Sequence, residues 1–243
     1  MPENLWLFAV LALLSEIIGT VSGFGSSILF VPIASYFYDF KSVLGITAVF
    51  HVFSNLSKIY LFRRGIDKEI ALKLGVPAVI AVIGGAVLTG YLPAKEMQVG
   101  MNVMLVALSV YLIINFNKKL NRTNATLYIG GTVSGFLAGL FGTGGAIRGI
   151  TLAAFQLPMA SFIATSALID LGVDGGRAIV YISQGYFKKD YILLIPLLIA
   201  ISIIGSYTGK KILRYTSEKV FRYLVHIVII TTCLIEVFNY FKK

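Results

Sequence analysis

Long apolar stretches alternate with short polar connections along the whole chain. Apolar runs of roughly 20 residues are long enough to cross a ~30 Å hydrocarbon core as helix. Lipid offers backbone groups no water, so such runs are helical, and the alternation of a membrane β-barrel is absent. The pattern predicts an all-α polytopic membrane protein with 8–10 transmembrane helices, in segments at 4–38, 43–62, 70–92, 97–116, 125–157, 159–187, 191–212 and 220–241.

Two of these segments are too long for one simple crossing. The stretch 4–38 holds GTVSGFGSS at its middle, and 125–157 holds Gly142-Thr143-Gly144-Gly145. Each glycine weakens a helix by about 1 kcal/mol relative to alanine. Each segment is therefore expected to be a broken element, either two short spans or one span with a re-entrant half-helix.

The chain repeats itself at a spacing of 119 residues. That shift superimposes Gly23, Gly25 and Ser26 on Gly142, Gly144 and Gly145; His51, Asn55 and Lys58 on Asp170, Asp174 and Arg177; and Pro77 on Pro196. We interpret this as an internal duplication, with a first repeat at 1–117, a polar loop at 118–124 and a second repeat at 125–243. Repeats with interrupted helices at matching positions are typical of secondary transporters, whose substrate sites lie near the bilayer midplane.

Composition and charge also indicate a membrane protein. Hydrophobic residues make up 57% of the 243 and charged residues only 13%, about half of what a soluble domain carries. The net charge of +10 comes mostly from connecting turns, which indicates helix orientation and contact with lipid headgroups rather than nucleic acid. Cys233 is the one cysteine, which excludes an internal disulfide. The N-terminus lacks a signal-peptide pattern, so the first run is expected to be retained.

The number of crossings stays open between eight and ten. With eight, each half has four spans and the halves run parallel; with ten, each half has five and the halves are inverted. Ten crossings with the N-terminus outside concentrate Lys and Arg more strongly on the cytoplasmic side, so the positive-inside rule favours ten, some of them short.

The motifs resemble those of the sulfite exporter TauE/SafE family of membrane permeases. The resemblance is carried by the G-x-G-G motif Gly142, Gly144 and Gly145, by Ala164-Thr165-Ser166, and by the repeated order of apolar segments. The first half departs from the pattern at Gly25-Ser26-Ser27. The resemblance implies a secondary carrier in a prokaryotic plasma membrane for the export or uptake of small sulfur-containing oxyanions or organosulfonates such as sulfite or sulfoacetate, with export as the direction we favour. Sulfur is implied by the resemblance alone.

The two breaks are candidate anion-binding loops. Free N–H groups at a helix N-terminus supply donors and a partial positive charge, and hydroxyl groups can add donors. The candidates are Gly23, Gly25, Ser26, Ser27, Gly142, Thr143, Gly144 and Gly145. The alternative is that these glycines only allow close helix packing, which is the interpretation we favour for Gly84 and Gly85.

Ionisable residues inside the apolar runs are the other candidates. His51, Asn55 and Lys58 share a helix face, as do Asp170, Asp174 and Arg177; charges in lipid usually pair or line a substrate or proton path. Arg148 follows the second break. Counting three cations against two aspartates gives +1 with neutral His51, which suits an anion. For Lys58 the alternative is an ammonium that reaches the interface, and for Arg177 a structural ion pair.

Proton coupling is the hypothesis for the driving force, with His51, Asp170 and Asp174 as candidate carriers. Glu16, His226 and Glu236 have no counterpart at the repeat shift. We interpret His226 and Glu236 as packing or interfacial residues; Glu16 either lines the path or, as we favour, has a packing role. An anion channel and a carrier of a non-sulfur organic anion are the rival functions. A membrane enzyme is disfavoured because no catalytic or metal motif is present. The expected partners are a small anion and lipid, with no cofactor, metal or nucleic acid; a homodimer is one candidate assembly.

Overall fold

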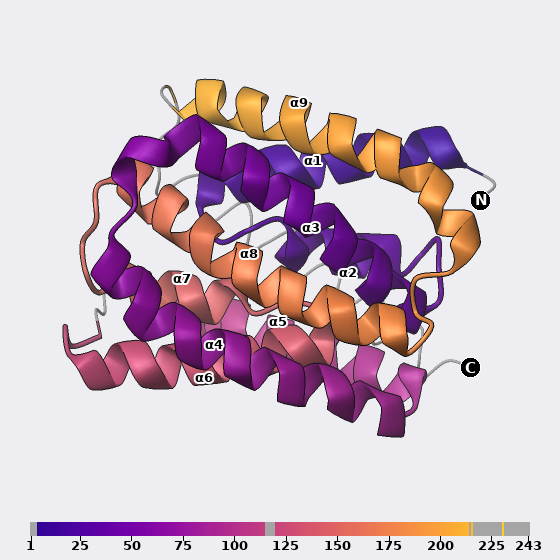
Figure 1. Cartoon of the computed structure of the whole chain (residues 1–243), viewed down its shortest axis with the longest axis horizontal. Helices are drawn as coiled ribbons and strands as arrows, with labels where there is room; N and C mark the ends of the chain where they lie inside the picture. The colour runs from indigo at the N-terminus through magenta and orange to yellow at the C-terminus, as the bar shows by residue number, and fades with distance from the viewer. Residues whose placement is uncertain (1–3, 115–119, 214, 216–229, 231–243) are drawn as a thin grey trace.

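A computed structural model describes residues 4–114, 120–213, 215 and 230. Within these residues all regular structure is helical (Figure 1). The helices are α1 (Leu5–Ser22), α2 (Ser27–Ala34), α3 (Phe40–Phe62), α4 (Lys68–Leu88), α5 (Ala94–Ile114), α6 (Asn124–Phe141), α7 (Gly145–Ala153), α8 (Met159–Ser183) and α9 (Ile195–Leu213), with 3-10 turns η1 (Arg63–Gly65), η2 (Thr89–Tyr91) and η3 (Lys189–Leu194). The expected segment 220–241 lies outside the described residues.

In the part of the chain that the structure describes, four helical stretches are long and apolar enough to cross a membrane. They are Leu5–Ser22, Phe40–Phe62, Lys68–Tyr91 and Lys189–Leu213. At 1.5 Å per residue, stretches of 18 to 25 residues rise about 27–38 Å, comparable to the hydrocarbon thickness. The protein is therefore a multi-pass helical membrane protein, as the hydrophobic pattern predicts.

Both long segments are broken at the expected glycines. Gly23 caps α1 with φ 72° and Gly142 caps α6 with φ 76°, a left-handed conformation that glycine adopts without steric cost. After each break a half-helix returns to the end of the molecule where the long helix began. Phe8 near the start of α1 packs on Phe37 and Tyr38 beyond α2, and Arg122 before α6 contacts Phe155 beyond α7.

Contacts along the helices fix their relative directions. Ser202 and Lys210 of α9 hydrogen-bond to Phe50 and Leu61 of α3, so α3 and α9 run parallel. Gly205 and Gly209 of α9 pack in order on Glu16 and Thr20, so α1 runs the same way. The start of α3 lies against the end of α8 and the end of α3 against its start, through Gly45 with Tyr186 and Gly65 with Ser161, so these two helices are antiparallel.

Helix α6 runs with α4 and α8, against α1. Gly131, Gly135 and Gly139 of α6 meet the carbonyl groups of Leu74, Ala78 and Val82 of α4 in order, leaving no room for a side chain. The contacts that Gly75 and Gly172 make between α4 and α8 show that these two helices also run in the same direction. The long helix of the first broken element therefore points opposite to that of the second (Figure 1). Gly85 also packs against the α6 backbone, as expected for a packing glycine, whereas Gly84 faces open space.

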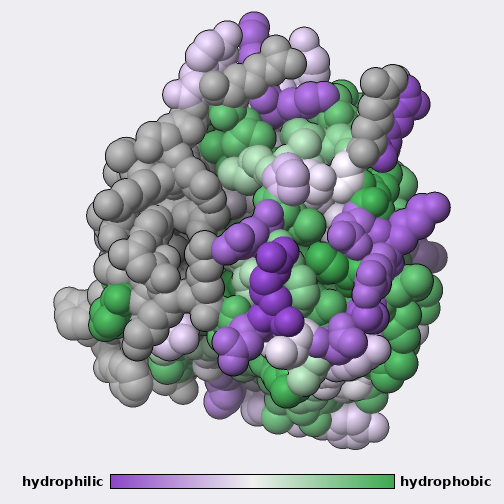
Figure 2. Space-filling view, turned by 90° about the vertical axis from the view of Figure 1, so that its left-hand side faces the viewer, coloured by the Kyte–Doolittle hydropathy of each residue, from purple (hydrophilic) through white to green (hydrophobic). Residues whose placement is uncertain are grey.

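Basic residues gather at one end of the bundle. The ends of α3 and α9 and the starts of α4, α6 and α8 share this end, at the left of Figure 1, and hydrophilic residues cluster there beside apolar ones (Figure 2). The opposite end carries fewer basic residues in the described chain. The larger set is Arg63, Arg64, Lys68, Lys73, Arg122, Lys210 and Lys211; the smaller is Lys41, Lys95, Lys188 and Lys189.

Candidate anion-binding site

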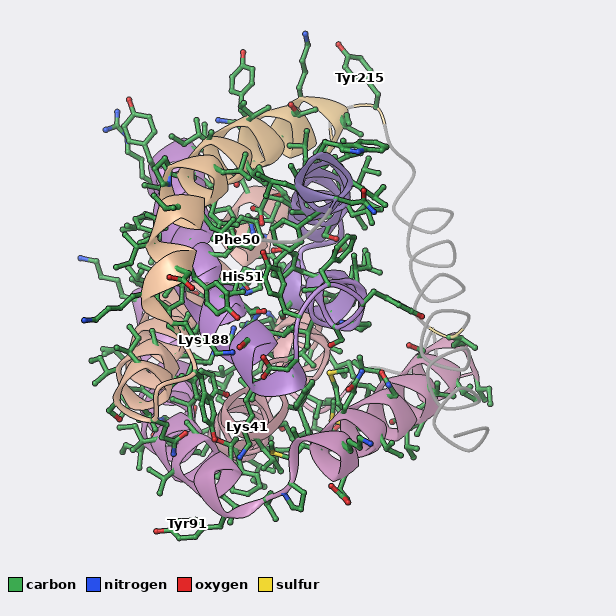
Figure 3. The ribbon with its side chains drawn as sticks, turned by 90° about the vertical axis from the view of Figure 1, so that its right-hand side faces the viewer. Lys41, Phe50, His51, Tyr91, Lys188 and Tyr215 are labelled. Carbon is green, nitrogen blue, oxygen red and sulfur yellow. The ribbon has the colours of Figure 1, made fainter. Side chains whose placement is uncertain are left out.

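A buried polar cavity lies where the two broken elements meet α3 and α8. The empty space between its lining atoms is about 320 Å³, including the part that opens to solvent. In a view from the end where α3 begins, His51 lies in the interior while Tyr91 and Tyr215 point outwards (Figure 3). The cavity is lined by Gly25, Ser26, Ser27, His51, Ser54, Asn55, Lys58, Ala138, Gly142, Gly144, Gly145, Arg148, Asp170, Val173, Asp174 and Arg177.

Most of the site residues expected from the sequence line this one cavity. Thr143 does not line it, but accepts a hydrogen bond from Ser27 at 3.4 Å. Gly23 lines an adjacent hollow of about 230 Å³ that shares Gly25, Asn55, Lys58 and Asp170 with the cavity. The structure thus brings together residues that lie more than 100 positions apart.

The two glycine breaks touch each other. Gly145 and Gly149 at the start of α7 leave space that the carbonyl group and ring of Phe24 occupy, so a side chain at either glycine would overlap Phe24. The residues that precede α2 and α7, Ser26 and Gly144, both line the cavity. Two helix N-termini therefore end at one polar space, where free N–H groups favour an anion.

Arg148 projects from α7 and pairs with Asp170 of α8 through Nη1 and Oδ1. Its Nε donates to Ser166 at 3.0 Å. Among the described residues, Arg148 is the only hydrogen-bonding or ionic partner of Asp170, whose side chain keeps 13% of its surface exposed. This is the least anchored of the carboxylates in the cluster.

Arg177 is held more firmly. Its Nε donates to Asp174 Oδ1 at 2.7 Å and its Nη1 to the Ala138 carbonyl group at 3.3 Å. Asp174 in turn accepts from Asn55 Nδ2 at 2.7 Å. These contacts join α3, α6 and α8 around the cavity.

Lys58 remains inside the protein and does not reach the interface. Its ammonium lies 2.9 Å from Glu16 Oε1 and 2.7 Å from Ser54 Oγ, and the side chains of Lys58 and Glu16 are 6% and 0% exposed. The alternative of a Lys58 that extends to the membrane surface is therefore wrong. Glu16, interpreted as a packing residue, proves to be the counter-ion of a cation that lines the cavity.

This pairing corrects the charge count. The expected excess of +1 omits Glu16; with it, Lys58, Arg148 and Arg177 face Glu16, Asp170 and Asp174, and the cluster is neutral when His51 is neutral. Each cation already has a carboxylate partner. An anion added to this cluster without displacing a carboxylate or bringing a proton would leave the cluster with a net charge of −1.

Two polar residues of the cluster escape the sequence reasoning. Ser54 shares the face of His51 and Lys58 and donates to Glu16 at 2.7 Å, but a serine in an apolar run carries little signal. Glu16 carried a clearer signal in the sequence, because a carboxyl group in a membrane helix is costly unless paired. Its partner could not be read from the repeat, since Gly135 stands at the matching position.

Paired charges around a polar cavity inside a helical membrane protein are expected of a protein that moves a polar solute across the membrane. The sequence profile of the family described as "Sulfite exporter TauE/SafE" matches residues 7–235. The chain belongs to this family. It is also 27% identical over 242 residues, covering 90% of each chain, to a protein of Methanocaldococcus jannaschii described as a "Probable membrane transporter protein". No solved structure matches the chain.

Proposed function

We propose that this protein is a secondary transporter that exports small sulfur-containing oxyanions or organosulfonates, such as sulfite or sulfoacetate, across a prokaryotic plasma membrane. The observation that carries the proposal is the set of three cations, Lys58, Arg148 and Arg177, around one cavity where two helix N-termini end. Fixed donors and cations of this kind replace the water that a permeating oxyanion leaves behind.

The lining favours a compact, polar substrate. Only Ala138 and Val173, among the described lining residues, contribute apolar side chains. An aromatic or long alkyl group would find few partners there, because ligand sites for such groups are mostly apolar. Sulfite and short sulfonates fit this chemistry.

Asp170 is the carboxylate we assign to the exchange with substrate. It lines both the cavity and the adjacent hollow and is held by Arg148, so its carboxylate occupies a position on Arg148 that a substrate oxyanion can take. A proton on Asp170 weakens its hold on Arg148 and changes the cluster from neutral to +1. One anionic charge and one proton then share the site and cross together, so export runs down the outward gradient of the anion and carries a proton out with it.

Alternating access follows from the opposed broken elements. We assign residues 1–117 and 125–243 to two inverted repeats joined by 118–124, with the anion held between Gly23–Ser27 and Gly142–Gly145. The antiparallel directions of α1 and α6 support this assignment. Rocking of one repeat against the other opens such a site to each side in turn. By the positive-inside rule, the end that carries Arg63 and Lys68 faces the cytoplasm.

A non-saturating anion channel or a carrier of carboxylates is the competing function. Thermal stabilisation of the purified protein by sulfite, thiosulfate, sulfoacetate, taurine, sulfate and acetate separates the substrate classes. Sulfite or sulfoacetate should raise the melting temperature of the wild type and not that of Arg148→Gln. Stabilisation by acetate alone would contradict the sulfur assignment, and equal stabilisation of Arg148→Gln would contradict the site.

A further inference from the structure

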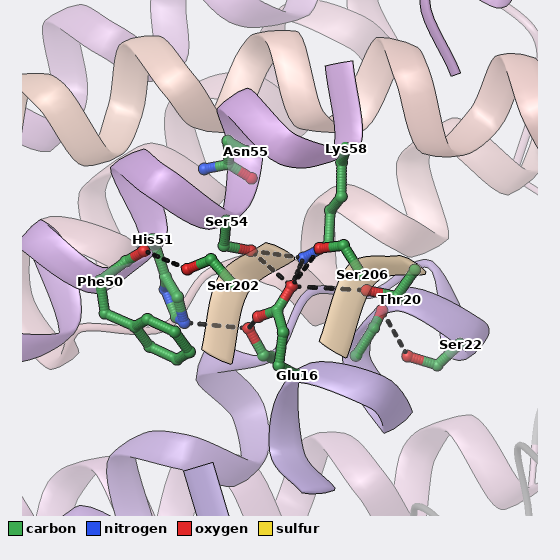
Figure 4. A network of polar contacts seen from close by, with 12 residues as sticks. Glu16, Thr20, Ser22, Phe50, His51, Ser54, Asn55, Lys58, Ser202 and Ser206 are labelled. Carbon is green, nitrogen blue, oxygen red and sulfur yellow. Dashed lines mark hydrogen bonds and ion pairs between the residues drawn. The ribbon is translucent and has the colours of Figure 1, made fainter. Parts of the chain in front are cut away.

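Glu16 lies at the centre of a polar network outside the cavity (Figure 4). Its Oε1 accepts hydrogen bonds from Ser54 at 2.7 Å and Ser206 at 2.9 Å, and its Oε2 accepts one from Ser26 at 2.7 Å. With Lys58 these donors come from α3, α9 and the start of α2. Gly205 leaves the space that the Glu16 side chain fills. The surroundings of Glu16 are built to hold a carboxylate.

The hydrogen-bond donors around His51 determine which ring nitrogen carries the proton. Arg177 Nη2 lies 3.4 Å from His51 Nδ1. A guanidinium group can only donate, so Nδ1 must accept and carries no proton. His51 Nε2, 3.0 Å from Ser26 Oγ, is then the protonated nitrogen and donates to Ser26.

Ser26 completes a one-way chain that begins at Glu16. A serine hydroxyl has a single proton, and Ser26 gives it to the Glu16 carboxylate. Its lone pair is therefore free to accept from His51 Nε2. The donors thus run from Arg177 to His51, from His51 to Ser26 and from Ser26 to Glu16.

We propose that Glu16 is a positioning residue that, together with the Arg177 donor, fixes the Nε2–H tautomer of His51 through Ser26 and so helps to orient the Arg177 guanidinium in the cavity. Glu16 does not touch the cavity and acts only through these residues. The consequence for anion binding rests on the proposed function; the tautomer of His51 does not.

The substitution Glu16→Gln tests this chain sharply. The amide oxygen of a glutamine must face the Lys58 ammonium, which leaves the amide NH2 facing Ser26. Ser26 then accepts from the amide, and its own proton is free to turn to His51 Nε2, which raises the share of the Nδ1–H tautomer against the preference that Arg177 sets. Glu16→Asp keeps a carboxylate and should restore the wild-type tautomer. Ser206→Ala is the matched control, because it removes a buried donor to Glu16 that is not in the chain.

The measurement is ¹⁵N NMR of the histidine ring in full-length protein carrying His226→Gln, which leaves His51 as its one histidine. We expect a protonated Nε2 and an unprotonated Nδ1 in this background and in Ser206→Ala, and a measurable share of the Nδ1–H tautomer in Glu16→Gln. A protonated Nδ1 in the background protein overturns the inference. So does an unchanged tautomer in Glu16→Gln.

If Glu16→Gln does not fold, Ser26→Ala gives a second test. It leaves the Nε2 proton without its acceptor, so the proton resonance should move to the position of a ring N–H that makes no hydrogen bond. An unmoved resonance overturns the inference.

Transport provides the functional comparison. Glu16→Gln leaves the cluster at +1, which by itself favours an anion. We nevertheless expect the misoriented Arg177 to raise the KM for sulfite by about 10-fold, as loss of the outer partners of metal ligands does, with a smaller change in kcat. Glu16→Asp, which keeps the charge, should recover part of that loss. An unchanged KM together with an altered tautomer would overturn the role of Glu16 in orienting Arg177. Absence of sulfite transport in the wild type would instead count against the proposed function.

Discussion

Asn55 donates a hydrogen bond to Asp174, with 2.7 Å between Nδ2 and Oδ2, and the two residues stand 119 positions apart. This is the spacing at which the two halves of the sequence superimpose. A direct contact between matching positions is expected on a pseudo-two-fold axis, because the axis maps each position onto its counterpart. The pair therefore supports the inverted-repeat arrangement that we propose.

Replacing Asn55 by Asp should destabilise the protein markedly. It places two carboxylates in contact inside the bundle, where an unpaired charge costs several kcal/mol. The double variant Asn55→Asp/Asp174→Asn again has one amide and one carboxylate and should recover part of the loss. Melting temperatures in detergent measure both changes. Gln156→Glu, at an exposed position, serves as the control for added charge; a single variant as stable as this control would contradict the contact.

The substitution Gly145→Ala should push apart the two glycine breaks, the loops that precede α2 and α7. The new methyl group would overlap the carbonyl oxygen of Phe24, and neither backbone can yield without moving α2 or α7. A loss of stability of about 1–3 kcal/mol is expected from such overpacking, together with a loss of transport. Gly84→Ala, which meets open space in a helix interior, is the matched control and should be neutral or stabilising. Equal behaviour of the two variants in a melting experiment would refute the contact between the breaks.

Asp39 at the start of α3 gives a pH-dependent prediction. Partial burial raises the pKa of Asp39. Hydrogen bonds from Ser42 and the nearby Lys188 ammonium lower it by more, so the net pKa lies below its usual value. The stability contributed by the Asp39 carboxylate is therefore present above the unfolded pKa and is lost as pH falls through the lower folded pKa.

The measurement is the melting temperature between about pH 6 and 3, near the usual pKa of Asp. Asp39→Asn, which keeps a capping side chain, should flatten part of the decline at the acid end of this range. The change should be small because the side chain is half exposed. An acid decline identical to that of the wild type would show that Asp39 does not contribute.

Much of the fold was accessible from the sequence because lipid leaves few choices. The apolar runs and the glycine breaks predict the helices and their interruptions, since a chain in lipid must satisfy its own backbone groups. The choice between parallel and inverted halves was not settled by charge alone. It depends on helix contacts such as Gly131 with Leu74, which no periodicity reveals.

The sequence predicted most residues of the candidate site, but not which of them form ion pairs with one another. The repeat identifies His51, Lys58, Asp170 and Arg177 because it aligns polar residues within apolar runs. It cannot identify Glu16, whose counterpart is a glycine. The neutral balance of the cluster follows only from the Lys58–Glu16 ion pair, and the proton coupling that we propose rests on this balance.

The central claim is that a small sulfur oxyanion and a proton share the site of Arg148 and Asp170. Sulfite flux into proteoliposomes, measured with and without an imposed pH gradient, tests it most directly. We expect saturable, gradient-driven flux in the wild type and loss of most flux in Arg148→Gln. In Asp170→Asn we expect flux that no longer responds to the gradient, while Asp190→Asn, in the turn after α8, should behave as the wild type. Flux that ignores the gradient in the wild type, or that survives in Arg148→Gln, would contradict the account.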